Sequence, residues 1–106
     1  MAGPSTRYAV TLAQFQRARG LLQARAGRFA AAETSLAQAA NTLRDAGNPF
    51  AFARALLDDG TVLIELSRTG EAVAVLQKAR SLFTQLGAAP WVERTDTTLT
   101  PVAAVA

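Results

Sequence analysis

Residues 60–79 read GTVLIELSRTGEAVAVLQKA. The apolar residues of this stretch recur every three or four positions, which places their side chains along one stripe of an α-helix. The segment 67–70, SRTG, interrupts the stripe with residues that favour turns. The stretch therefore predicts two antiparallel helices joined by this turn, with Gly60 and Ala72 small enough to let the helices touch.

The same pattern occurs 40 residues earlier in the chain. Residues of similar size form equivalent pairs: Gly20 and Gly60, Ala32 and Ala72, Leu36 and Leu76, Ala39 and Ala79, Leu43 and Phe83, Gly47 and Gly87. An internal repeat of this kind predicts helix pairs that stack on one another and bury a continuous core. The expected fold class is all-α, because no segment shows the strict alternation of a strand.

Turn-forming residues predict four full helices and a short fifth, at 6–26, 29–46, 49–66, 70–86 and 91–99. The strongest boundary is Gly47-Asn48-Pro49. Glycine suits the left-handed position after a helix, asparagine caps the next helix, and proline suits its first position. Thr6 is the expected cap of the first helix, and Pro101 is expected to end the last one.

Apolar residues on one stripe of each helix are the expected core. They are Ala9, Leu12, Phe15, Leu22 and Ala26, then Phe29, Ala32, Leu36, Ala39 and Leu43, then Phe52, Leu56, Leu63 and Leu66, and finally Ala72, Val73, Leu76, Ala79 and Phe83. The expected organisation is a flexible N-terminus at 1–5, a helical repeat domain at 6–99 and a C-terminal tail at 100–106. Within the domain, repeat one spans 6–47, repeat two spans 48–87 and a half repeat spans 88–99.

Composition argues against several classes of function. The chain has no cysteine and no histidine, so disulfides, most zinc sites and histidine-based catalysis are not expected. Asp58 and Asp59 are adjacent on a predicted helix, where consecutive side chains point about 100° apart. They are therefore expected on the helix surface rather than at a shared metal ion. We expect the chain not to be an enzyme and to bind no cofactor.

Hydropathy points to a cytoplasmic protein without a membrane partner. Charges interrupt every apolar run before the roughly 20 residues that a membrane span needs. The segment 1–7, MAGPSTR, lacks the apolar stretch of a signal peptide.

Positive charge is concentrated in the first half of the chain. Residues 1–47 contain six arginines against Glu33 and Asp45, a net charge of +4, whereas residues 48–106 contain five basic and six acidic side chains, a net charge of −1. This asymmetry favours head-to-tail stacking or an asymmetric partner, and a solvated arginine-rich surface is the alternative. A nucleic-acid-binding domain is less favoured, because no aromatic residue is interleaved with Arg17, Arg25 and Arg28 for base stacking.

The repeated pattern resembles the tetratricopeptide repeat family. Its members have a glycine midway along the first helix of each pair, and an alanine, a large apolar residue and a second alanine on the second helix. The matching residues are Gly20, Ala32, Leu36 and Ala39 in one repeat, and Gly60, Ala72, Leu76 and Ala79 in the other. The turn AGRFAAAE at 26–33 is also similar. The resemblance implies a short right-handed solenoid of about two and a half repeats. The chain departs from the family pattern at Arg19 and Asp59, where the family has leucine.

The spacing between the repeats is longer than the usual length of about 34 residues. This long form is similar to the repeats of bacterial signalling proteins, including LuxR-type transcription regulators. The segment 79–99, ARSLFTQLGAAPWVERTDTTL, resembles the last repeat of those regulators. That resemblance implies a fragment of a bacterial signalling or transcription regulator.

The resemblance also implies a binding face, because the first helix of each pair lines the concave wall of such a solenoid. The matching residues are Gln14, Arg17, Leu21 and Ala24 in repeat one, and Arg54, Leu57, Thr61 and Ile64 in repeat two. The expected function is a non-catalytic protein–protein interaction module, whose mixed apolar and cationic wall binds a peptide or a partner protein. The alternative is a structural spacer or dimerisation domain with no peptide ligand.

Two further expectations concern one pair of opposite charges and the ends of the array. Arg19 and Asp59 occupy equivalent positions and have opposite charges, so we expect them to face each other across neighbouring first helices. Apolar residues are expected to be uncovered at both ends, namely Tyr8, Leu12 and Phe15 at one and Trp91, Val92 and Leu99 at the other. Such faces need cover, which predicts a twofold homodimer or burial against neighbouring repeats of a longer chain.

Overall fold

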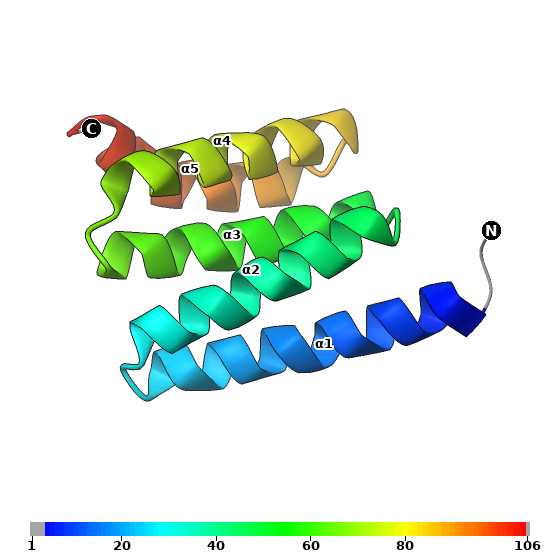
Figure 1. Cartoon of the computed structure of the whole chain (residues 1–106). Coiled ribbons are helices and arrows are strands. Elements are labelled where there is room, and N and C mark those ends of the chain that lie inside the picture. Colours follow the sequence, from blue (N-terminus) through cyan, green and yellow to red (C-terminus); the bar gives the residue numbers. More distant parts are fainter. Residues whose placement is uncertain (1–3, 106) are drawn as a thin grey trace.

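A computed structural model describes residues 4–105 of the chain (Figure 1). It contains α1 (Pro4–Arg25), α2 (Phe29–Asp45), α3 (Pro49–Glu65), α4 (Thr69–Gln85) and α5 (Ala89–Ala103), with no strand in the described range. Consecutive helices run in opposite directions, in a body that measures 44 × 33 × 19 Å. The all-α prediction is confirmed. α1 begins two residues before the predicted cap Thr6, and residues 1–3 of the predicted flexible N-terminus lie outside the described range.

The four turns share one backbone conformation, repeated every 20 residues. One residue in each turn has a positive φ angle: Gly27 (78°), Gly47 (71°), Ser67 (58°) and Gly87 (68°). The N–H of this residue bonds to the carbonyl three positions back, and the next N–H bonds to the carbonyl five positions back. This is the Schellman arrangement, which satisfies carbonyls at the end of a helix. The repeating structural unit is therefore one helix and one turn.

The predicted helix boundary at Gly47-Asn48-Pro49 is confirmed. Gly47 adopts the left-handed conformation, and Pro49 is the first residue of α3. Between them, the side chain of Asn48 accepts a hydrogen bond from the N–H of Ala51 at 3.2 Å. The turn predicted at residues 67–70 is shorter than expected, because α4 already begins at Thr69.

Each helix packs against the next one in the chain, and the odd-numbered helices also contact one another. α1 touches α3, and α3 touches α5, whereas α2 and α4 do not approach each other within the described residues. The odd-numbered helices therefore lie along one side of the array, with the even-numbered helices on the other.

Two glycines allow the close approach that the sequence predicts. A Cβ atom at Gly20 would lie 2.6 Å from Cγ of Leu36, and one at Gly60 would lie 2.6 Å from Cγ of Leu76. Both leucines are fully buried, as expected of equivalent core residues. In each pair, a leucine of the second helix thus packs on the bare backbone of the first.

The predicted core is confirmed for the inner helices but is wrong for α1. Buried as predicted are Ala32, Leu36, Ala39, Leu43, Phe52, Leu56, Leu63, Ala72, Leu76, Ala79 and Phe83, whereas Phe29, Leu66 and Val73 are half-buried. In α1, Leu12, Phe15, Leu22 and Ala26 are exposed and Ala9 is half-buried. Between residues 7 and 25 of α1, the buried residues are the small Ala13 and Gly20. The spacing fits two stripes on this helix, and the larger side chains occupy the stripe that no described helix covers.

α5 is longer than predicted. It runs from Ala89 through Pro101 to Ala103, so residues 100–103 of the predicted tail are helical. Proline removes one backbone hydrogen bond, and in the last turn this loss does not stop the helix. The expected apolar C-terminal face is also wrong, because Leu99 is buried and Trp91 and Val92 pack against the core.

Candidate functional site

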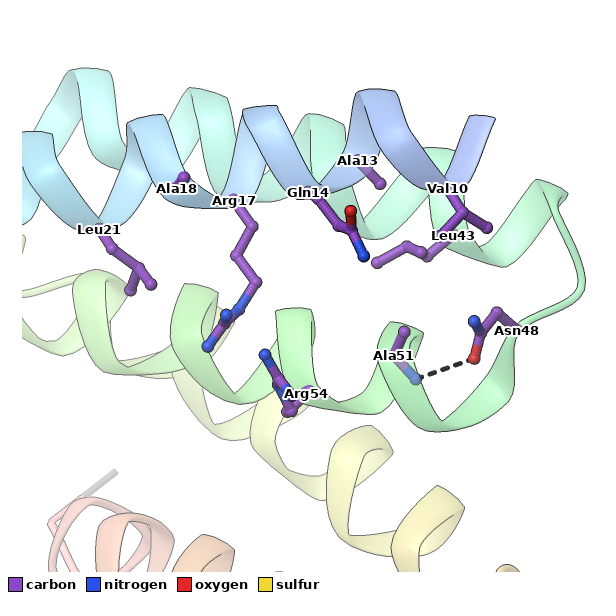
Figure 2. A pocket seen from close by; sticks show the side chains of 10 residues that line it. All are labelled: Val10, Ala13, Gln14, Arg17, Ala18, Leu21, Leu43, Asn48, Ala51 and Arg54. Atoms are coloured by element: carbon purple, nitrogen blue, oxygen red, sulfur yellow. Dashed lines mark hydrogen bonds between the residues drawn. The ribbon is translucent and has the colours of Figure 1, made fainter. Parts of the chain in front are cut away.

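A groove of about 250 Å³ lies between α1 and α3 (Figure 2). Apolar, amide and cationic side chains line it: Val10, Ala13, Gln14, Arg17, Ala18, Leu21, Leu43, Asn48, Ala51 and Arg54. The structure thus brings together four of the eight residues predicted for the concave wall, namely Gln14, Arg17, Leu21 and Arg54. Val10, Ala18 and Ala51 were missed, although each lies three or four positions from a predicted residue on the same helix.

One cation of the groove is paired with a carboxylate on the facing helix. Nε of Arg17 donates to Oδ2 of Asp58 at 2.6 Å, and the two side chains are 28 and 20 % exposed. Burial raises the pKa of Asp58 above its ordinary value, and the neighbouring guanidinium of Arg17 partly offsets this effect. The pair joins α1 to α3 across one wall of the groove.

The second cation, Arg54, has no carboxylate within ion-pairing distance among the described side chains. It is half-buried, and its guanidinium carbon lies 6.0 Å from the centre of the Trp91 ring. The Trp91 ring stacks on the ring of Phe83, with 5.4 Å between the ring centres. It also makes an edge contact with the ring of Phe50, with 5.5 Å between the centres. An aromatic cluster from three helices therefore lies beside the groove's unpaired cation.

The other four predicted residues do not line the groove. Ala24 is half-buried against the cluster around Leu36, and Leu57 is only 8 % exposed. Ile64 packs against the core, and the hydroxyl of Thr61 donates to the carbonyl of Leu57 at 2.9 Å. Thr61 is exposed outside the groove, and the other three residues are directed towards the packing between helices.

The predicted pairing of Arg19 with Asp59 is wrong. Arg19 is exposed and lies beside Leu12 and Phe15, whereas Asp59 is 5 % exposed. The ion pair that forms instead joins Arg17 and Asp58. Arg17 lies two residues before Arg19, and Asp58 lies one residue before Asp59.

Asp59 is a buried acid, so the expectation that both aspartates lie on the helix surface is also wrong. Its Oδ1 atom has no hydrogen-bond partner among the described residues. Burial and the adjacent carboxylate of Glu33 raise the pKa of Asp59 to about 8. Arg68 opposes this rise, and its Nη1 atom lies 3.7 Å from Oε1 of Glu33.

Within the described range, no three histidine, cysteine, aspartate or glutamate side chains lie close enough together to hold a metal ion. No described helix is both long enough and apolar enough to cross a membrane. No protein-family model matches the chain, and neither a curated protein nor a solved structure matches it.

Proposed function

We propose that this chain is a non-catalytic protein–protein interaction module that binds a peptide segment of a partner protein in the groove between α1 and α3. The observation that carries the proposal is the composition of the groove. The unpaired Arg54 lines the same groove as apolar side chains that include Leu21 and Leu43. Such a wall suits an acidic side chain flanked by apolar ones, because charge complementarity fixes the register and apolar contacts supply affinity.

The size of the groove favours a peptide over a small molecule. Its volume of about 250 Å³ is below the roughly 300–1,000 Å³ that is usual for small-molecule pockets. A few side chains of a peptide would fill it. Because Arg17 is already paired with Asp58, recognition of an anion falls to Arg54, with the amides of Gln14 and Asn48 as further polar groups.

We also propose that the array is a tetratricopeptide-like solenoid from a cytoplasmic bacterial signalling or transcription regulator. The contacts of Gly20 with Leu36 and of Gly60 with Leu76 support the first part, since they recur at the positions of the family pattern. The resemblance of residues 79–99 to the last repeat of LuxR-type regulators supports the second.

Selection from a random peptide library displayed on phage tests the proposed groove. We expect the selected peptides to contain aspartate or glutamate next to an apolar residue. Arg54→Glu should abolish binding of these peptides, and Leu21→Ser should weaken it. Arg44→Glu makes the same charge change on an exposed side chain that does not line the groove, and it should leave binding unchanged.

The alternative is a structural spacer without a peptide ligand, which the Arg17–Asp58 pair favours because it joins the two repeats. In that case the library would give no peptide that depends on Arg54. Circular dichroism of Arg54→Glu and Leu21→Ser establishes that both variants are folded.

A further inference from the structure

An odd-numbered helix within the array has two packing faces, one towards the helix before it and one towards the helix after it. Residues 40 positions apart occupy corresponding places on these faces. In α3, Val62 packs with Ala32 and Leu36 of α2. Phe52 and Ala55 belong to the cluster that contains Ala40 and Leu43 of α2 together with Leu76 and Ala79 of α4. Asp59 lies near Glu33 of α2. We call Phe52, Ala55, Asp59 and Val62 the preceding face of α3. Its following face includes Gly60, which receives Leu76 of α4.

No described helix packs over the preceding face of α1, although Gln38 of α2 lies at its edge beside Leu12, Phe15 and Arg19. Forty positions earlier, the residues that correspond to Phe52, Ala55, Asp59 and Val62 are Leu12, Phe15, Arg19 and Leu22. The apolar members of this set are at most 8 % exposed in α3, whereas those in α1 are 39–71 % exposed. Tyr8, which is 71 % exposed, extends the stripe by one turn. The face that α3 buries against its neighbours is therefore exposed to solvent on α1.

The charges of α1 define what would complement this surface. α1 contains no acidic residue, and apart from Arg17, which pairs with Asp58 in the groove, its arginines Arg7, Arg19 and Arg25 are exposed. Arg19 stands where α3 has Asp59, the residue that lies near Glu33 of α2. A helix placed on α1 as α2 is placed on α3 would bring a glutamate at the Glu33 position close to Arg19.

We propose that the preceding face of α1 is a docking site for an acidic amphipathic helix of a partner protein, which packs antiparallel to α1 with a carboxylate opposite Arg19. By analogy with α2, the docked helix has small or leucine side chains at positions that correspond to Ala32, Leu36, Ala40 and Leu43, and an acid next to the first of them. This site lies outside the groove between α1 and α3 and does not depend on the function proposed for that groove.

A second copy of the chain fits this surface less well. If two α1 helices packed face to face, every charged side chain between them would be an arginine, because neither helix carries a carboxylate. The residues of α5 that correspond to Ala53, Leu56 and Gly60 of α3 are polar: Glu93, Thr100 and Asp96, the last of which pairs with Arg80 of α4 at 2.6 Å. Neither α1 nor α5 therefore combines apolar side chains with an acid at the position that Glu33 occupies in α2.

A synthetic peptide with the sequence of residues 29–45 is the probe. The peptide is labelled, blocked at both ends, and held helical by a cross-link between the positions of Thr34 and Gln38, which are exposed in α2. We expect saturable binding by fluorescence anisotropy, weakened roughly tenfold or more by Phe15→Asp, because an anchor at the centre of an interface dominates its affinity. Val105→Asp changes an exposed apolar residue outside the docking face and should have no effect.

A charge exchange tests the orientation of the docked helix. Arg19→Glu should weaken binding, and a peptide with lysine at the position of Glu33 should restore it with this variant but not with the wild-type chain. Failure of the peptide to bind, or equal binding to Phe15→Asp and Val105→Asp, would overturn the proposal. Light scattering without peptide shows whether a second copy of the chain occupies this face. A dimer that Phe15→Asp dissociates would also overturn the proposal. If no library peptide bound the groove in an Arg54-dependent way, the binding of the 29–45 peptide to α1 would still stand.

Discussion

At the scale of single residues, Asp59 makes folding depend on pH. The pKa of Asp59 rises from 3.8 to about 8, because the side chain is buried and lies beside Glu33; Arg68 opposes this rise and Glu71 adds to it. Between these values the folded chain holds a proton that the unfolded chain has released. The free energy of unfolding should therefore fall as the pH rises from about 4 to about 8.

Asp59→Asn is expected to stabilise the chain at pH 8 by about 1–3 kcal/mol, the usual cost of a buried group without a partner. The gain should shrink towards pH 5, where Asp59 is protonated and resembles the amide. Urea unfolding at the two pH values measures the difference. Asp45→Asn is the control, because the side chain of Asp45 is 73 % exposed. An equal gain from Asp59→Asn at both pH values would contradict the explanation.

A second prediction at this scale concerns the contact between Gly60 and Leu76. Gly60→Ala places a methyl group 2.6 Å from Cγ of Leu76, and the overpacking should cost about 1–3 kcal/mol. At Gly70 a Cβ atom would meet nothing within 4 Å, so Gly70→Ala should be neutral or slightly stabilising. Chemical denaturation compares the two variants. Equal effects would mean that the helices are free to move apart at Gly60.

At the scale of the helices and turns, Ser67 is the one serine in a set of four equivalent turn positions. Its φ angle of 58° is left-handed, as are those of Gly27, Gly47 and Gly87. A side chain makes that conformation costly, so Ser67→Gly should raise the free energy of unfolding by about 0.5–1 kcal/mol. Ser81→Gly, in the interior of α4, should lower it by about 0.5 kcal/mol. Thermal unfolding that shifts both variants in the same direction would disprove the role of the turn.

The helix boundaries could be predicted because particular residues favour one local conformation. Gly47, Asn48 and Pro49 each match their positions. The end of α5 could not be predicted, because a proline in the last turn removes only one hydrogen bond. The buried face of α1 could not be predicted either. Its spacing is equally consistent with both stripes, and the position of α2 decides between Ala13 and Phe15.

The candidate site could be predicted only in part, for the same reason. The resemblance places Gln14, Arg17, Leu21 and Arg54 on one wall, and the structure gathers these four at the groove. Which of two adjacent aspartates meets Arg17 depends on how α3 is rotated between α2 and α4. Sequence spacing does not determine that rotation.

At the scale of the whole molecule, the two ends of the array differ in polarity. α1 exposes Tyr8, Phe15 and Leu22, whereas α5 exposes Glu93 and Thr100 at positions where α3 buries Ala53 and Gly60. A polar outer face is what keeps the terminal unit of a repeat array soluble. α5 therefore has the character of a cap, and α1 does not.

Replacing the exposed residues Glu93 and Thr100 by leucine should remove this cap. The variant would have unpartnered apolar surfaces at both ends, and contacts between unlike ends do not close into a symmetric dimer. We therefore expect its mass in light scattering to grow with concentration beyond twice 11.1 kDa. Ala74→Leu combined with Lys78→Leu adds apolar area on an exposed part of α4 and should cause no such growth. Adding Phe15→Asp to the α5 variant should stop the growth, and growth that continued would place the contact away from α1.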